Sequence, residues 1–494
     1  MSITPRPFRN VDKQFCLLRT LAFRIAVSVC FSAALISSAT GQGSQHPTAD
    51  LLSELIQIDT SNPPGSTNKV ADLLTRRLRP LGFEIQVVPT PDTGKAHFIA
   101  RLRGDGSRKP VLLAAHADVV GVEREKWTVD PFAGIIRDGY VHGRGAIDFK
   151  GGLAVFTQAL MQLVGNHVPL HRDVILLSEA DEESGRYNTS WLADSHWDLI
   201  DCEFALNEGG WIIQDSTGNV QYVSVSTADK LSIPLILTAK GTSTHSSMPL
   251  PDNPILTLSK ALAKLGDYET PLELLPSTRE FLETLAKTSA PPLSQNLKTL
   301  LNSKDAQAVQ EADRDVSQNP LLHAVMRNTI APVILKAGFR GNVIPGSAEA
   351  TVNLRLIPGT DFDGLLANIR RVIGDDRVNV SLAPASTPEG TRGAELLKLS
   401  SLTPSPKETG LYRALEQSAH SIWPERPVTT YLFQAGTDAI AWRRRGVPVY
   451  GIYPYPITAD DLRRMHGNDE RVPVKSLEQG TELIYKALVQ LESE

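Results

Sequence analysis

Residues 111–120 read VLLAAHADVV: an apolar run, Val111–Ala115, leads directly into His116 and Asp118. A short and unbroken apolar run of this kind is typical of a buried strand in a parallel sheet. In open α/β sheets, ligands bind beyond the carboxyl ends of the strands. The stretch therefore predicts an α/β fold with a polar site that begins at His116.

Predicted strands and helices alternate on both sides of this run. Strands are predicted at Phe83–Val88, Phe98–Leu102, Val174–Leu177 and Phe204–Leu206, and a helix at Gly152–Val164. The same pattern returns near the C-terminus, with helix Tyr412–Ile422, strand Val447–Tyr453 and helix Ser476–Leu491. This alternation predicts a mainly parallel sheet flanked by helices. The chain is expected to form it in two parts, residues 46–228 and 389–494.

A different pattern occupies residues 229–388. Strands are predicted at Leu231–Ala239, Ile330–Lys336, Ala348–Leu356 and Val378–Leu382, and helices at Ile255–Leu265 and Asp361–Ile373. Their β-α-β-β-α-β order predicts a small α+β domain inserted into the first one. Residues 268–322 are polar with helical stretches, and residues 384–410, rich in Pro, Ser and Gly, are predicted to be the return linker.

The N-terminal segment 1–39 is predicted to be a signal peptide. Basic residues precede an uncharged apolar run, Ile25–Ala39, which ends in small residues suited to cleavage. This run is shorter than the roughly 20 residues that a membrane-spanning helix needs. We therefore expect a protein exported to the periplasm or the medium, with no stable membrane partner. The alternative is that the segment stays attached as a membrane anchor.

The composition excludes several classes of protein. Of the 494 residues, 41% are hydrophobic and 21% are charged. Disordered, collagen-like, coiled-coil and polytopic membrane proteins have other compositions. The net charge of −5 shows no basic footprint, so no nucleic-acid partner is expected. Cys202 is the only cysteine outside the predicted signal peptide, so the mature chain has no internal disulfide.

Acidic side chains gather where predicted strands end. Asp181–Glu183 follow the strand Val174–Leu177, and Glu208 follows the strand Phe204–Leu206. Asp148 lies in a glycine-rich turn before a predicted helix. Each of these acids alone is usually a helix cap or a solvated turn residue. Packed together they repel one another unless they are protonated or bind a cation, so they predict a metal site at this edge of the sheet.

The predicted ligands are carboxylates and imidazoles without thiolates. Such a set suits Zn, Mn or Co. Their number suggests two metal ions that share one carboxylate. His466, within the sequence RMHGN of residues 464–468, could supply a further imidazole.

Ordered motifs extend from about residue 50 to about residue 490. They are HADVV (116–120), GRGAIDFKG (143–151), DEESG (181–185), NEGG (207–210), HSS (245–247), NVIP (342–345), GTD (436–438) and MHG (465–467). In these motifs the chain resembles the M20 metallopeptidase/amidohydrolase family, and within it the branch of carboxypeptidase S and the N-fatty-acyl-amino-acid hydrolases. The resemblance implies a metal-dependent catalytic domain, formed by residues 46–228 and 389–494. It also implies that residues 229–388 form a lid and dimerisation domain.

The resemblance assigns a role to each residue of the metal site. Two zinc ions are expected in each subunit, with Co²⁺ or Mn²⁺ as alternatives. The implied roles are a bridging ligand (Asp148), the ligands of one ion (His116 and Glu208), those of the other (Glu183 and His466), a residue that orients the His116 ring (Asp118) and the general acid/base (Glu182).

Four further residues are implied to meet the substrate. His245, in the inserted domain, is expected to stabilise the oxyanion in the active site of the neighbouring subunit of a homodimer. Arg355 and Asn342 are expected to bind the substrate carboxylate and polar backbone. Gly436 is expected to line the wall near the scissile bond.

Together these expectations describe a zinc-dependent hydrolase that cleaves an amide bond beside a free carboxylate. Its substrate is expected to be a short peptide or an N-acyl amino acid, as for a metallo-carboxypeptidase or an N-acyl-amino-acid amidohydrolase. The alternatives are an aminopeptidase or dipeptidase on the same scaffold, and a non-catalytic binding module that retains a metal. Glu182 favours the enzyme, because a binding module has no need of an unliganded carboxylate beside the metals.

Overall fold

The computed structural model describes residues 45–384, 393, 397 and 403–493. The chain divides into two units, Met1–Gly43 and Ser44–Glu494, and all elements below belong to the second unit. The predicted signal peptide 1–39 and the predicted domain boundary between residues 388 and 389 lie outside the described residues. Within the part that is described, no helix is both long and apolar enough to cross a membrane.

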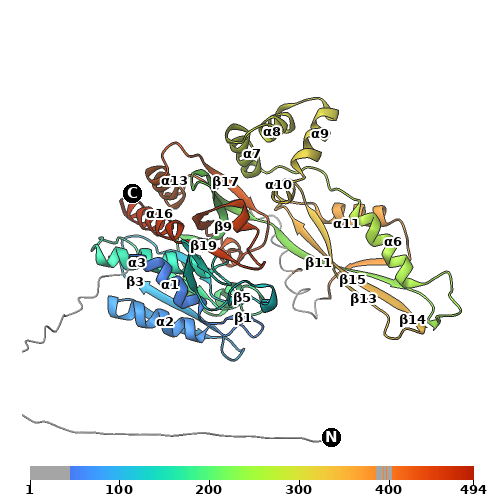
Figure 1. Ribbon diagram of the computed structural model, residues 1–494, viewed down its shortest axis with the longest axis horizontal. Coiled ribbons are helices and arrows are strands. Elements are labelled where there is room, and N and C mark those ends of the chain that lie inside the picture. The colour runs from blue at the N-terminus through green and yellow to red at the C-terminus, as the bar shows by residue number, and fades with distance from the viewer. Residues whose placement is uncertain (1–44, 385–392, 394–396, 398–402, 494) are drawn as a thin grey trace, which may run out of the picture. The chain divides into compact units, whose positions relative to one another are not determined.

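The largest sheet has eight strands and is flanked by helices (Figure 1). Its strands are β2 (Glu84–Pro89), β3 (Ala96–Leu102), β4 (Val111–His116), β8 (Val174–Glu179), β9 (Phe204–Gln214), β10 (Val220–Asp229), β17 (Val428–Phe433) and β18 (Val449–Ile457). They lie in the order β17-β10-β18-β9-β4-β8-β3-β2. Strands β8, β4, β9 and β18 are parallel to one another, and β2 and β3 are antiparallel at one edge. The predicted α/β fold with a mainly parallel sheet is confirmed.

Helices from both ends of the chain pack together on this sheet (Figure 1). Helix α3 contacts β4 and α1, and α16 contacts β18, α3 and α13. The helices are α1 (Pro47–Ile56), α2 (Asn68–Leu78), α3 (Lys150–Gly165), α13 (Gly410–Ile422) and α16 (Val474–Ser493). The short elements in the two chain segments that form this sheet are β1 (Ser61–Asn62), η1 (Arg79–Leu81), β5 (Val119–Val120), η2 (Arg124–Lys126), β6 (Ile135–Arg137), β7 (Tyr140–His142), α4 (Thr189–Ser195), α5 (Trp197–Ile200), α14 (Ile440–Arg443), α15 (Ala459–Leu462) and β19 (Arg471–Pro473).

The sequence patterns do not predict two strands of the large sheet, β10 and β17. Both strands bury hydroxyl side chains, among them Ser224, Ser226 and Thr429. The Ser224 hydroxyl donates to the carbonyl oxygen of Trp211 at 3.0 Å, which satisfies it inside the core. Because hydroxyls interrupt the apolar run that marks a buried strand, these segments could not be recognised by their hydropathy.

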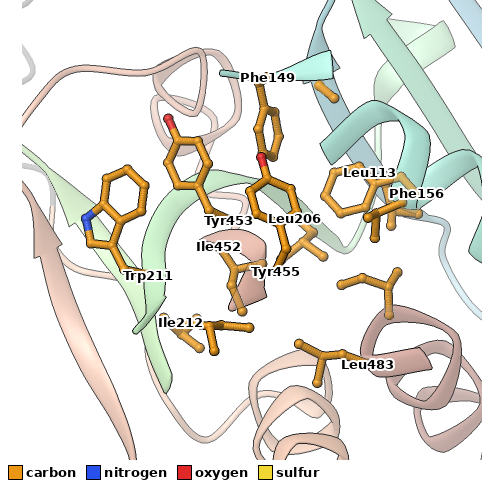
Figure 2. Close-up of a cluster of buried hydrophobic side chains, with 14 of the residues drawn as sticks. Leu113, Phe149, Phe156, Leu206, Trp211, Ile212, Ile452, Tyr453, Tyr455 and Leu483 are labelled. Carbon is orange, nitrogen blue, oxygen red and sulfur yellow. The ribbon is translucent and has the colours of Figure 1, made fainter. Parts of the chain in front are cut away.

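Aromatic side chains of β9 and β18 form a closely packed part of the core (Figure 2). The rings of Trp211 and Tyr453 stack, with centroids 4.1 Å apart and planes inclined by 9°. The Phe149 ring meets Tyr453 edge-on, with centroids 5.0 Å apart. Each such ring pair contributes about 0.5–1.5 kcal/mol beyond the burial of its area. This packing fixes the Tyr453 ring and, with it, the position of the hydroxyl group.

A second sheet of four strands has its own hydrophobic core. Its strands are β11 (Leu231–Lys240), β13 (Thr329–Ala337), β15 (Ser347–Leu356) and β16 (Val378–Leu382), in the antiparallel order β13-β15-β11-β16. Helix α6 (Pro254–Gly266) packs on β11 and β15, and α11 (Phe362–Ile373) packs on α6. A separate two-stranded antiparallel sheet pairs β12 (Thr244–His245) with β14 (Val343–Ile344). The strands and the helices α6 and α11 follow the β-α-β-β-α-β order expected from the sequence.

Four helices inside the predicted inserted domain pack elsewhere. They are α7 (Pro276–Thr288), α8 (Leu293–Asn302), α9 (Ala306–Val316) and α10 (Pro320–Met326). Their apolar side chains join the core of the eight-stranded sheet. Phe281 of α7 meets Tyr431 of β17 edge-on, with ring centroids 5.0 Å apart. The prediction of a single inserted domain over 229–388 is therefore corrected. Because α7 buries its apolar face against β17, the helices within residues 276–326 belong to the core of the eight-stranded sheet and not to that of the four-stranded sheet.

Candidate active site

Six of the predicted site residues meet at one edge of the large sheet. His116 ends β4, and Glu182 and Glu183 follow β8. The ligand atoms of His116, Glu182 and Glu208 lie within 4.8 Å of one another, as do those of His116, Asp148 and Glu183. Together with His466, side chains that are up to 350 positions apart in the sequence thus form one polar cluster.

Asp148 occupies the middle of this cluster. Its Oδ1 lies 3.1 Å from Nε2 of His116, and its Oδ2 lies 2.9 Å from Nε2 of His466. The two oxygens of one carboxylate therefore face two different imidazoles. This is the arrangement that a ligand shared between two cations needs.

Glu208 and Glu183 complete the two sides of Asp148. Glu208 Oε2 lies 3.7 Å from Nε2 of His116, and Glu183 Oε1 lies 3.2 Å from Nε2 of His466. Each side of Asp148 thus holds one imidazole and one further carboxylate. The structure brings together all five residues that the sequence resemblance implied as metal ligands.

A bulge in β9 presents Glu208. In the pairing of β9 with β18, Asn207 pairs with Gly451 and Gly210 with Ile452, so Glu208 and Gly209 have no partner residues. Such a bulge re-aims a side chain. A Cβ atom at residue 209 would lie 2.9 Å from the Cα of Gly451, so only glycine fits there. The sequence analysis predicted a strand that ends at Leu206, with Glu208 in the loop after it. In the structure, β9 continues to Gln214, and Glu208 lies within the strand.

The electrostatics of the cluster favour positive charge on both sides of Asp148. Although burial opposes ionisation, hydrogen bonds from His116 and His466 hold the pKa of Asp148 well below its ordinary value. The bonds to Asp148 and Glu183 raise the pKa of His466 to about 11. Burial and the charge of Asp148 raise the pKa of Glu208 to about 7. Protons on the two histidines thus lie between carboxylates, where divalent cations could replace them, and the residues fit a metal site.

Glu182 lies beside the cluster on the side of His116 and Glu208. Burial, followed by the negative charges of Glu208 and Asp438, raises the pKa of Glu182 well above its ordinary value. A carboxylate with a raised pKa accepts a proton more readily near neutral pH. Glu182 therefore has the environment of a general base.

Asp118 acts differently from the sequence expectation. The Nδ1 atom of His116 lies 2.8 Å from the backbone carbonyl oxygen of Asp118 but 3.7 Å from its carboxylate. The Asp118 carboxylate instead accepts hydrogen bonds from the backbone N–H groups of Glu182 and Glu183, both at 3.1 Å. The His116 ring is thus oriented by a carbonyl group, because the carboxylate is occupied by the loop that follows β8.

Tyr453 is a site residue that the sequence analysis missed. Its hydroxyl donates to Glu208 Oε2 at 2.9 Å and to Asp148 Oδ1 at 3.2 Å. The aromatic packing of Figure 2 holds the ring that carries this hydroxyl. The only signal in the sequence is the position of Tyr453 in a predicted strand of the second part of the catalytic domain.

A cavity of about 980 Å³ opens from the cluster along the four-stranded sheet. Arg355 and Gly436 line it together with Asp148, Glu182 and His466. The lining on the four-stranded sheet comes from the face opposite its hydrophobic core and includes Ile236, Thr351 and Asn353. A substrate that reaches the cluster therefore also meets Arg355.

His245 and Asn342 lie elsewhere in the described chain. Both are exposed at the two-stranded β12–β14 sheet, where Ser246 N–H donates to the carbonyl oxygen of Asn342 at 3.0 Å. The His245 ring nitrogen Nδ1 lies 2.8 Å from the Ser247 hydroxyl. Neither residue is among the described residues that line the cavity, so the structure does not bring them to the cluster of their own chain.

Taken together, an α/β fold and a cluster of carboxylates and imidazoles at the strand ends define a metal-dependent hydrolase. Residues 112–490 match peptidase family M20/M25/M40, and the chain belongs to this family.

Known proteins similar to the chain agree with this assignment. It is 30% identical to the human (Homo sapiens) N-fatty-acyl-amino acid synthase/hydrolase over 400 residues. This matched region covers 80% of this chain and 76% of the relative. It is 29% identical over 392 residues to a probable carboxypeptidase S-like protein of Dictyostelium discoideum, covering 77% and 71%. The M20 family metallo-carboxypeptidase of Sulfolobus solfataricus shares the fold with a TM-score of 0.64, at 18% identity over 90% of this chain and 99% of that one. The predicted family and branch are confirmed.

Proposed function

We propose that this hydrolase cleaves an amide bond beside a free carboxylate, in N-acyl amino acids or at the C-terminus of short peptides. The observation that carries the proposal is that Arg355 and the Asp148 cluster line one cavity. A guanidinium binds a carboxylate through two parallel hydrogen bonds, which orient the substrate as well as hold it. The relatives named as an N-fatty-acyl-amino acid synthase/hydrolase and as carboxypeptidase S-like support this substrate class.

In this proposal the cluster would hold two divalent cations, zinc in the first place. His116 and Glu208 would bind one of them, Glu183 and His466 would bind the other, and Asp148 would be shared by both. Cobalt or manganese would suit the same oxygen and nitrogen donors. When bound, such ions lower the pKa of water and polarise the oxygen of a carbonyl group.

The residues of the chain supply the proton transfers and the positioning. Glu182 accepts a proton from the attacking water and later donates it to the leaving amine. Arg355 binds the carboxylate next to the scissile bond. Gly436 lines the same cavity, where a Cβ atom would lie 3.4 Å from the backbone oxygen of Lys230, and its small size leaves room for the substrate.

We also propose that the protein is a homodimer formed through the four-stranded sheet. Strand β13 is at the edge of that sheet and exposes Val333 and Leu335, at 57% and 61%. An edge strand offers unpaired backbone groups to another strand, and contacts across a two-fold axis are reciprocal. Such a dimer accounts for His245 and Asn342, which are outside the cavity of their own chain and would act in that of the partner.

The test of the substrate class is a panel of N-acyl amino acids, each compared with its carboxyl amide. A hydrogen bond to a charged group contributes about 2–3 kcal/mol of binding free energy. Without the free carboxylate, kcat/KM should therefore fall roughly 30- to 150-fold. Arg355→Met should lower the rate on the free acids by the same factor and leave the rate on the amides unchanged. Arg371→Met, at an exposed arginine of the same domain, is the matched control and should change neither rate.

Two results would count against this substrate class. Equal rates on acids and amides in the wild-type enzyme would remove the role of the carboxylate. Turnover confined to peptides with a free amino group would instead favour the aminopeptidase or dipeptidase alternative.

A mixing experiment tests the action of His245 across the dimer. His245→Ala and Glu182→Gln are each expected to have little activity, since an oxyanion donor is worth roughly 3–4 kcal/mol. In a mixed dimer, one active site receives both an intact Glu182 and an intact His245, so part of the activity should return. His420→Ala, at another exposed histidine, replaces His245→Ala in the control and should be active before mixing. Confirmed mixed dimers without activity, or a fully active monomer, would disprove catalysis across the dimer.

A further inference from the structure

The side chain of Asn62 lies between two buried carboxylates behind the metal cluster. Its Nδ2 group donates to Oδ2 of Asp118 at 2.8 Å and to Oδ1 of Asp181 at 3.0 Å. Both aspartates are fully buried. Asn62 belongs to β1, which pairs with β5 immediately after Asp118. One amide group thus uses both of its N–H donors to join two carboxylates that are 63 positions apart in the sequence.

These two carboxylates hold the loop that carries Glu182 and Glu183. Asp118 accepts the backbone N–H groups of Glu182 and Glu183, both at 3.1 Å. Asp181 Oδ2 accepts those of Arg186 and Tyr187, at 3.1 and 2.8 Å. The start and the end of the loop are therefore attached to the two groups that Asn62 joins.

Lys95 completes the arrangement from the other side. Its ammonium group is buried, forms an ion pair with Oδ1 of Asp181 and lies 3.4 Å from Oδ1 of Asn62. This contact turns the amide oxygen of Asn62 towards the lysine and both N–H donors towards the aspartates. The positive charge of Lys95 also offsets one of the two buried negative charges, and charges of this kind are costly when unpaired.

A tight turn confines the Asn62 side chain. Gly65 has a φ of +69°, and its N–H donates to the carbonyl oxygen of Ser61 at 2.8 Å. A Cβ atom at residue 65 would lie 3.0 Å from Cγ of Asn62 and 3.2 Å from Cε of Lys95. The turn therefore leaves the amide little room to move away from the two aspartates.

We propose that Asn62 is a positioning residue for Glu182 and Glu183. By joining Asp118 to Asp181 it sets the backbone of the loop, and the backbone sets where the proposed general base and one proposed metal ligand lie. The inference rests on the proposed function for the roles of these two glutamates. Its consequence is selective, because His116 and Glu208 are held by β4, β9 and Tyr453, whereas Glu183 depends on the loop. Loss of the Asn62 amide should therefore disturb the His466 side of the cluster more than the His116 side.

The test uses the zinc-loaded enzyme with Asn62→Asp, which keeps the shape of the side chain and replaces the donors by a third carboxylate. Replacing a residue that orients a metal ligand typically lowers metal affinity or activity 10- to 100-fold. In a titration with the chelator dipicolinate, one of the two zinc ions should leave at a chelator concentration about tenfold lower than in the wild type, and the other should leave unchanged. With the preferred substrate, kcat should fall about 10- to 100-fold and KM should change little.

Two further variants keep the result interpretable. Gly65→Ala pushes on the Asn62 side chain without changing its donors, and should shift zinc release in the same direction by a smaller factor. If Asn62→Asp fails to fold, zinc release from Gly65→Ala tests the positioning role in its place. Asn368→Asp, the same substitution at an exposed position of α11, should change neither zinc release nor kcat.

The outcomes separate this inference from the proposed function. Unchanged zinc release and kcat, with only a lower thermal stability, would overturn the positioning role. Equal weakening of both zinc ions would overturn it too, because a general loosening of the fold has no preference for one side. The release experiment needs no substrate, so a selective loss of one ion would support the role of Asn62 even if the substrate panel disproved the carboxylate preference.

Discussion

Glu182→Gln should lower kcat by about 10⁴-fold while both metal ions stay bound. Glutamine keeps the size and polarity of the side chain but cannot accept a proton from water. The buried environment that raises the pKa of Glu182 suits it to that transfer, and the expected loss is at the upper end of the range for general acid–base catalysis. The measurements are steady-state kinetics and the metal content of the purified variant.

Glu183→Gln is the matched control for this prediction, since it makes the same substitution in the adjacent residue of the same loop. It should lose metal from the His466 side, because Glu183 Oε1 lies 3.2 Å from the His466 ring nitrogen. If Glu182→Gln lost metal and Glu183→Gln kept it, the two glutamates would have exchanged roles. Normal turnover of Glu182→Gln would end the general-base assignment.

Asp148→Ala should remove both metal ions and, with them, all measurable turnover. The two carboxylate oxygens of Asp148 face His116 and His466 separately, at 3.1 and 2.9 Å. Each side of the cluster would therefore lose a ligand in a single substitution. Elemental analysis of the purified variant, compared with the wild type, measures the effect directly.

Asp148→Asn and Asp363→Ala sharpen the result. The asparagine keeps the shape of Asp148 and loses its negative charge, so it should also lose metal if the charge is what holds two cations together. Asp363 is exposed on α11, and its replacement should leave the metal content unchanged. Two tightly bound ions in Asp148→Ala would contradict the bridging role.

Much of the candidate site could be predicted from short segments of the chain. The apolar run of β4 ends at His116, and the strand ends nearby carry Asp181–Glu183. In an open α/β sheet such positions share one edge, so their convergence follows from the topology. The motif order then indicated the family, and the resemblance implied how these residues and His466 would be divided between two metal ions.

Other parts of the site depend on contacts that no local pattern contains. Glu208 is presented by a bulge in the middle of β9, and the bulge is visible only in the pairing with β18. Tyr453 reaches Glu208 because Trp211 and Phe149 hold its ring. The choice of the carbonyl rather than the carboxylate of Asp118 as the partner of His116 depends on the loop after β8, which occupies the carboxylate.

The sequence alone determined the fold class, the family and the order along the chain of the strands and helices that form the four-stranded sheet and cover it. All of these follow from patterns among neighbouring residues, since hydropathy period and motif spacing are local properties. The tertiary structure decided which core holds α7–α10, which side chains orient the ligands and that Asn62 joins Asp118 to Asp181. These features arise where segments far apart in the chain pack against one another, and the partners of a buried polar group are set by that packing.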